Sequence, residues 1–200
     1  MNKFWTIILI LALIFIESQI LSFYNTEDEI LIEEATVNNE LIDSLKDCLV
    51  FIENSGNGIV LTSDGVVLTL SSIINTNSEF IIKEQSLIYE VLKRDRINDL
   101  ALVQLGKQGI ETNCQYSLDD IIQGQDIYIL GIDEDKQYVF NKGIVKNISD
   151  LIHTNIIEDE SLSGSIAFNE EGKIIGMVKI NNNGFVDIIP AILLKEFTGL

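Results

Sequence analysis

From Cys48 onward the chain alternates between short apolar runs and turn-forming residues. The clearest pair of runs is 58–62 and 66–70, which Ser63-Asp64-Gly65 joins as a hairpin turn. Further strands are expected over 49–53, 80–83, 88–93, 100–105, 127–130, 138–140, 143–148, 173–180 and 184–188. A short helix is expected over 191–197, after Pro190, because proline is tolerated in the first turn. Many short strands with so little helix predict an all-β barrel or sandwich, and the hydrophobic pattern does not choose between them.

The N-terminus carries a different signal. Lys3 precedes an uncharged, mostly apolar run from Phe4 to Ile16, which is the layout of a secretory signal. A small-x-small cleavage site is not evident, and extending the run to Phe23 gives the roughly 20 residues that a membrane span needs. We therefore expect residues 1–24 to be an uncleaved anchor with Lys3 on the cytoplasmic side and the rest extracytoplasmic. A cleaved signal, which would make the protein secreted, is the alternative.

An acidic stretch follows the apolar segment. Residues 25–46 are expected to form a linker, and residues 47–200 to form one folded domain. The chain has 13 Lys and Arg against 31 Asp and Glu, a formal net charge of −18. A nucleic-acid partner is excluded by this balance, because such binding relies on basic side chains that neutralise phosphates.

The two cysteines, Cys48 and Cys114, form no CxxC motif and no cluster with metal-ligand spacing. We therefore expect no metal ion and no cofactor. Outside the cytoplasm the two residues could form a disulfide. Two separate buried thiols are the favoured interpretation.

Three segments carry polar residues in a recognisable order. Segment 56–69 has a Gly-Asn-Gly turn, an Asp-Gly turn and a strand ending in Leu-Thr. Segment 94–103 reads Arg-Asp-Arg-Ile-Asn-Asp-Leu-Ala-Leu-Val, and segment 161–165 reads Ser-Leu-Ser-Gly-Ser. In this order and spacing they resemble the protease domain of the HtrA/Deg family of trypsin-like serine proteases, over residues 47–200. No PDZ domain, which many members carry, is expected.

This resemblance implies a trypsin-like fold of two six-stranded antiparallel β-barrels with a short C-terminal helix. Asp99 matches the catalytic aspartate and Ser163 matches the nucleophile, whereas Ser72 falls where the family has its catalytic histidine. The backbone N–H groups of Ser161 and Ser163 match the oxyanion hole. The family has glycine at the position of Ser161, since glycine adopts backbone angles that other residues resist.

These departures predict loss of catalysis. A serine hydroxyl cannot act as the general base near neutral pH, and removing that base costs on the order of 10⁶ in turnover. The acidic residues 158–160 would oppose a developing oxyanion. His153 is the chain's single histidine, but the resemblance places it on a strand away from Asp99.

We expect a catalytically inactive protease homologue that binds a peptide or protein partner outside the cytoplasm. One alternative is an active serine endopeptidase in which Ser163 uses another base, either His153 or one of the lysines Lys142, Lys146 and Lys179. A second alternative is a structural interaction domain of the cell envelope. The sequence leaves the oligomeric state open.

Overall fold

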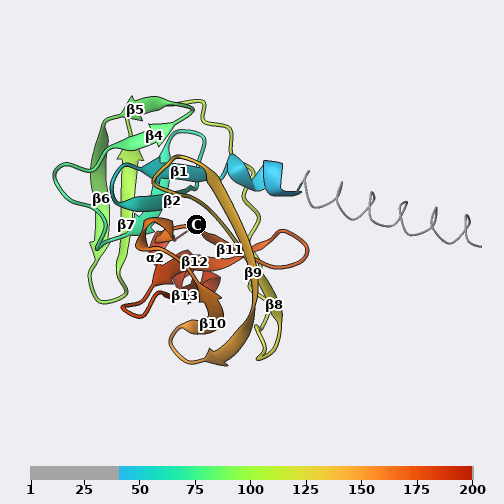
Figure 1. Cartoon of the computed structure of the whole chain (residues 1–200). Coiled ribbons are helices and arrows are strands. Elements are labelled where there is room, and N and C mark those ends of the chain that lie inside the picture. Colours follow the sequence, from blue (N-terminus) through green and yellow to red (C-terminus); the bar gives the residue numbers. More distant parts are fainter. Residues whose placement is uncertain (1–40, 200) are drawn as a thin grey trace, which may run out of the picture. The chain divides into compact units, whose positions relative to one another are not determined.

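The computed structural model describes residues 41–199 (Figure 1). The chain divides into two units, Met1–Leu41 and Ile42–Leu200. The predicted anchor, 1–24, and residues 25–40 of the predicted linker, 25–46, lie outside the described residues. Within residues 41–199, no helix is both long and apolar enough to cross a membrane.

The described part is built from short strands. They are β1 (Leu49–Ile52), β2 (Gly56–Val60), β3 (Val66–Leu70), β4 (Phe80–Ile82), β5 (Gln85–Leu87), β6 (Tyr89–Asp95), β7 (Leu100–Leu105), β8 (Asp126–Ile132), β9 (Tyr138–Ile148), β10 (Ile152–Ile157), β11 (Ile166–Phe168), β12 (Ile174–Ile180) and β13 (Phe185–Pro190). Helical segments are the short 3₁₀ helix η1 (Glu160–Leu162), the C-terminal helix α2 (Ala191–Thr198) and residues 41–46.

The strands form two sheets, which occupy different parts of the domain in Figure 1. Strands β8 to β13 close a six-stranded barrel in the order β10-β13-β12-β11-β8-β9. Strands β1 to β7 form a seven-stranded sheet in the order β5-β4-β1-β2-β3-β7-β6. Each sheet encloses its own apolar core, one centred on residues such as Phe80 and Val103, the other on residues such as Ile129 and Val178.

The double-barrel fold that the resemblance implies is confirmed, and its second barrel has the expected six strands. The first differs from the prediction, because it is a half-barrel of seven strands with β5 and β6 at its edges. The reason is visible in β6, where every residue is exposed or half-buried. A strand that buries neither face gains little apolar burial from closing the sheet.

Strand β9 also differs from the prediction of two strands, over 138–140 and 143–148. Residues 141 and 142 were expected as a break, but they pair with Ile129 and Tyr128 of β8 within one continuous strand. Gly143 is part of that strand because β10 packs closely over it. An added Cβ there would lie 2.3 Å from the Ile156 side chain. The pattern does not predict β5 and β11, which have only three residues each, and it also misses β10, which has six.

Cys48 and Cys114 form a disulfide with a Cα–Cα distance of 5.8 Å. The favoured interpretation of two separate thiols is therefore wrong. The tertiary structure brings the residue before β1 against the segment that connects the two sheets, and this Cα spacing is ordinary for a disulfide.

The short helix predicted over 191–197 is confirmed as α2. It buries Ala191, Leu194 and Phe197 and ends at Gly199, which has the left-handed backbone common at helix C-termini.

Candidate functional site

Asp99 lies in the turn between β6 and β7 and is contacted by Ser72, the second residue after the end of β3. The Ser72 backbone N–H donates to Asp99 Oδ1 at 2.8 Å, and the Ser72 hydroxyl donates to Oδ2 at 3.0 Å. This contact follows from strand register, since Leu70 at the end of β3 pairs with Leu100 at the start of β7. The structure thus brings together two of the three predicted triad positions.

A third donor reaches Asp99 from the other barrel. The Lys179 ammonium, on β12, lies 2.7 Å from Asp99 Oδ2. The side chains are 37% exposed for Lys179 and 13% exposed for Asp99. The Asp99 carboxylate therefore pairs with a hydroxyl and an ammonium, whereas the aspartate of an active triad pairs with an imidazole. An ammonium carries no lone pair, so in this arrangement Lys179 offers Ser163 no base.

Ser163 is buried and directly follows η1. Its hydroxyl oxygen accepts the backbone N–H of Ile180 at a long 3.4 Å, and Ile180 is the neighbour of Lys179 on β12. Ser163 is therefore close in the fold to the Asp99–Lys179 pair. Among residues 41–199, no imidazole or carboxylate makes a hydrogen bond with the Ser163 hydroxyl.

The two N–H groups predicted for an oxyanion hole already have acceptors. The Ser163 N–H donates to the Glu160 carbonyl at 2.9 Å, which closes the turn of η1. The Ser161 N–H donates to the Asp159 carboxylate at 2.9 Å, because Asp159 is the N-cap of the same short helix. A side-chain carboxylate thus accepts the hydrogen bond that a substrate oxyanion would need.

The loop that carries Ser163 is held by Asn57, a residue that the sequence analysis did not single out. Asn57 is fully buried on β2, and its amide donates to the Ser161 carbonyl at 2.9 Å. The same side chain makes two hydrogen bonds of 2.9 Å with the backbone of Ile132 on β8. Its backbone N–H donates to the Ser163 carbonyl at 2.8 Å. The sequence offers one indication of this role, which is that Asn57 is a polar residue between two glycines at the start of an apolar strand.

Gly164 shows how closely this loop approaches β2. Its φ is +86°, and an added Cβ would lie 2.0 Å from the Asn57 carbonyl oxygen. Only glycine fits both the backbone angle and the space. The Gly in the Ser-Gly pair is thus explained by packing against the first sheet.

The other bases considered from sequence lie elsewhere. His153 contacts Asp187 and Ser149. Lys142 pairs with Asp126 at 2.7 Å, and this hydrogen bond raises the pKa of its ammonium. Lys146 is exposed on β9. None of these three makes a hydrogen bond with Ser163 in the described part of the chain.

An antiparallel half-barrel and a closed antiparallel barrel, with an aspartate and a serine-bearing loop between them, place the chain in the trypsin-like class. The chain belongs to the trypsin-like peptidase domain family, whose model matches residues 56–177, a range that includes Ser72, Asp99 and Ser163. No curated protein matches the sequence.

Proposed function

We propose that this trypsin-like domain is an HtrA/Deg-type homologue that binds a peptide or protein segment on the extracytoplasmic side of a membrane without cleaving it. In this proposal Ser72, Asp99 and Ser163 are the positions of a lost catalytic triad. The domain keeps the fold of a peptidase and uses its surface for recognition.

The observation that carries the proposal is the set of partners around Asp99. Its carboxylate receives a serine hydroxyl and a lysine ammonium, and neither group can take a proton from Ser163 in this arrangement. The occupied N–H groups of Ser161 and Ser163 support the same conclusion, because charge that develops on a substrate oxygen would find no free donor there.

A recognition role is supported by a pocket beside this region. It has a volume of about 820 Å³ and lies between the turn before Asp99 and helix α2. Basic side chains outnumber acidic ones in its lining, with Lys93, Arg94 and Arg96 against Asp95 and Glu196, and Ile97 and Phe197 add apolar surface. Ile97 is 95% exposed. A bound segment with apolar and acidic side chains would match this lining.

Catalytic inactivity is tested with a fluorophosphonate probe on the full-length chain, followed by peptide mass spectrometry of the segment that contains Ser163. We expect no adduct on Ser163 and no cleavage of casein. An adduct that disappears in Ser163→Ala would contradict the proposal and favour the alternative of an endopeptidase with an unusual base.

The variant Ser72→His separates the two causes of inactivity. It restores an imidazole beside Asp99 but leaves the Ser161 and Ser163 N–H groups bonded within η1. We expect Ser163 to remain unlabelled. Labelling in this variant would mean that the oxyanion donors are available and that the missing base alone explains the inactivity.

Binding is tested by fluorescence anisotropy with fluorescein-labelled casein as an unfolded probe. Ile97→Glu should weaken binding about fivefold, an effect of roughly 1 kcal/mol. Ile122→Glu is the matched control, because Ile122 is also exposed but lies in the segment between the sheets. Equal effects of the two variants, or no binding at all, would contradict a recognition site beside Asp99.

A further inference from the structure

A second group of reactive side chains lies on the other barrel. The Nε2 atom of His153 is 3.1 Å from the Ser149 hydroxyl, and its Nδ1 atom is 2.7 Å from Asp187 Oδ1. The hydrogen-bond order is serine, histidine, aspartate, with each ring nitrogen facing the partner that it faces in serine hydrolases. The imidazole that is missing beside Asp99 is thus present here.

The barrel places these groups on one face. His153 of β10 and Lys179 of β12 are both paired directly with Asp187 of β13. Directly opposed residues on antiparallel strands project to the same side of the sheet. Ser149 lies in the tight turn between β9 and β10, where its N–H donates to the Leu151 carbonyl at 2.9 Å. The nucleophile and its base therefore come from one β-hairpin.

Asp187 is suited to orient the imidazole. It is 8% exposed, and its other carboxylate oxygen accepts the Asn181 amide at 3.1 Å. Because a carboxylate oxygen can only accept a hydrogen bond, the contact with Asp187 favours the tautomer of a neutral His153 that carries its proton on Nδ1. The lone pair of Nε2 is then directed at the hydroxyl of Ser149, which is exposed. A base that is oriented by a third group is the signature of an activated nucleophile.

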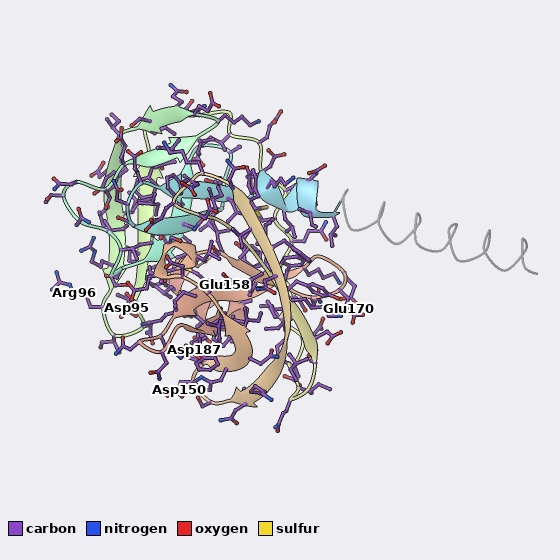
Figure 2. All side chains as sticks on the ribbon, viewed as in Figure 1. Asp95, Arg96, Asp150, Glu158, Glu170 and Asp187 are labelled. Carbon is purple, nitrogen blue, oxygen red and sulfur yellow. A yellow bond between two sulfur atoms is a disulfide. The ribbon has the colours of Figure 1, made fainter. Side chains whose placement is uncertain are left out.

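Ser149 opens into a pocket. The pocket has a volume of about 590 Å³, and most of its lining is apolar. The lining includes Ser149, Leu151, Lys179, Ile189 and Ile192. It also includes Ile97, Asn98 and Leu193, which it shares with the pocket beside Asp99, so the two pockets adjoin. Lys179 is the basic side chain that lines this pocket, and its ammonium is also paired with Asp99 Oδ2 at 2.7 Å, so a negatively charged oxygen would share this charge with Asp99. Asp150 also lines the pocket and disfavours an anionic acyl group. Figure 2 labels Asp150 and Asp187, which lie on the second barrel.

We infer that Ser149, His153 and Asp187 form a second site, separate from the position of Ser163, that hydrolyses esters of neutral apolar acyl groups. The Ser149 oxygen bonds to the acyl carbon while Nε2 of His153 takes the hydroxyl proton. The bond from that carbon to the alcohol oxygen breaks, and His153 passes the proton to the departing alcohol. Water then attacks the acyl-serine, loses a proton to His153, and releases the carboxylic acid as Ser149 regains its proton.

The experiment uses the full-length chain with p-nitrophenyl butyrate as substrate and with the fluorophosphonate probe, whose adduct is mapped by mass spectrometry. We expect release of p-nitrophenol and an adduct on Ser149. Ser149→Ala should abolish both signals. His153→Gln should lower kcat/KM by about 10²- to 10⁴-fold, the usual contribution of a general base. Ser163→Ala is the matched control and should leave the rate and the Ser149 adduct unchanged.

Circular dichroism of each variant controls for folding, and the exposure of Ser149 makes Ser149→Ala a mild change. Absence of any adduct on Ser149, or a rate that survives Ser149→Ala in a folded protein, would overturn the inference. An adduct on Ser163 would contradict the proposed function and would leave the Ser149 site to be judged by its own adduct. The two proposals can therefore fail separately.

Discussion

Asp99 and Asp187 are two carboxylates of similar setting with different partners. Asp99 lies at the turn before β7 and receives the hydroxyl of Ser72 and the ammonium of Lys179. Asp187 lies within β13 and holds an imidazole, that of His153, together with the Asn181 amide. Both acids are largely shielded from solvent, and each is fixed by at least two side chains.

The difference shows that a carboxylate alone does not define a catalytic centre. Its effect depends on whether its partner can accept a proton from a third group. At Asp99 both side-chain partners act as donors only, so the arrangement stabilises structure. At Asp187 the imidazole has a second nitrogen that faces a hydroxyl, so a route for proton transfer exists.

The largest expected effect concerns the loop on the Asp99 side. Asn57→Ala removes three side-chain hydrogen bonds, two of them buried, and leaves the Ile132 and Ser161 backbone groups without this partner. We expect a loss of roughly 3 kcal/mol in the free energy of unfolding, measured by urea denaturation. Asn141→Ala is the control, since Asn141 is exposed, its amide N–H donates to the Glu158 carboxylate and its amide oxygen accepts the N–H of the adjacent Lys142. Similar losses in both variants would show that Asn57 does not hold the loop.

Hydrogen exchange sharpens this first prediction. In Asn57→Ala, exchange should increase across residues 159–165 and remain unchanged across residues 149–153, because Asn57 bonds the first segment and not the second. An equal increase in both segments would mean that the two regions are not independent.

A smaller effect is expected for the ion pair between the barrels. Lys179→Met keeps an apolar stem but removes the positive charge beside Asp99. Because Lys179 is more than one-third exposed, solvent screens the pair and the loss should be only about 1 kcal/mol. Lys146→Met, at an exposed position of β9, should change the stability by less than about 0.5 kcal/mol. A loss no larger than in that control would show that Ser72 alone compensates Asp99.

The smallest effect, and one of opposite sign, is expected at a polar group without a partner. The Tyr116 hydroxyl is buried and makes no hydrogen bond with the described residues, and burial raises the pKa of its phenol. Tyr116→Phe removes this unsatisfied group and should stabilise the protein by about 0.5–1 kcal/mol. A clear destabilisation would mean that the hydroxyl has a partner in solution.

The same tyrosine predicts a pH dependence. The unfolded phenol ionises near its ordinary pKa of about 10, whereas the folded one stays neutral to higher pH. The phenol therefore adds no pH dependence below about pH 10, and as the pH rises further its ionisation in the unfolded chain lowers the free energy of unfolding. Unfolding curves from pH 8 to 11 should show a shallower alkaline decline for Tyr116→Phe than for the wild type.

Much of the fold could be predicted from the sequence because its strands are marked locally. The Ser63-Asp64-Gly65 turn and the apolar runs beside it appear as β2 and β3. Errors arose where local signals were misleading or weak. Asn141-Lys142-Gly143 has the composition of a break, yet neighbouring strands keep it extended. The cysteine pairing depended on a contact between residues 66 positions apart, which no local pattern contains.

For the candidate site, residue types could be predicted but partners could not. The absence of histidine from position 72 is visible in the sequence and already argues against a conventional triad. The sequence does not reveal that Lys179 reaches Asp99 or that Asn57 holds the Ser163 loop, because each of these contacts joins separate elements of the fold. The Asp159 cap is local, but it forms only because the chain turns into η1 at that point.

The sequence by itself determined an all-β domain that has the aspartate and serine of a trypsin-like catalytic triad, Asp99 and Ser163. It also determined that the triad histidine is replaced by Ser72. Hydrophobic periodicity and turn residues act over a few positions, so the strands and turns that they specify can be predicted from the sequence. Only the tertiary structure decided which groups face each other. Strand register places His153 opposite Asp187, whereas Asp99 pairs with Lys179. Register is set by strand pairing and side-chain packing over the whole barrel.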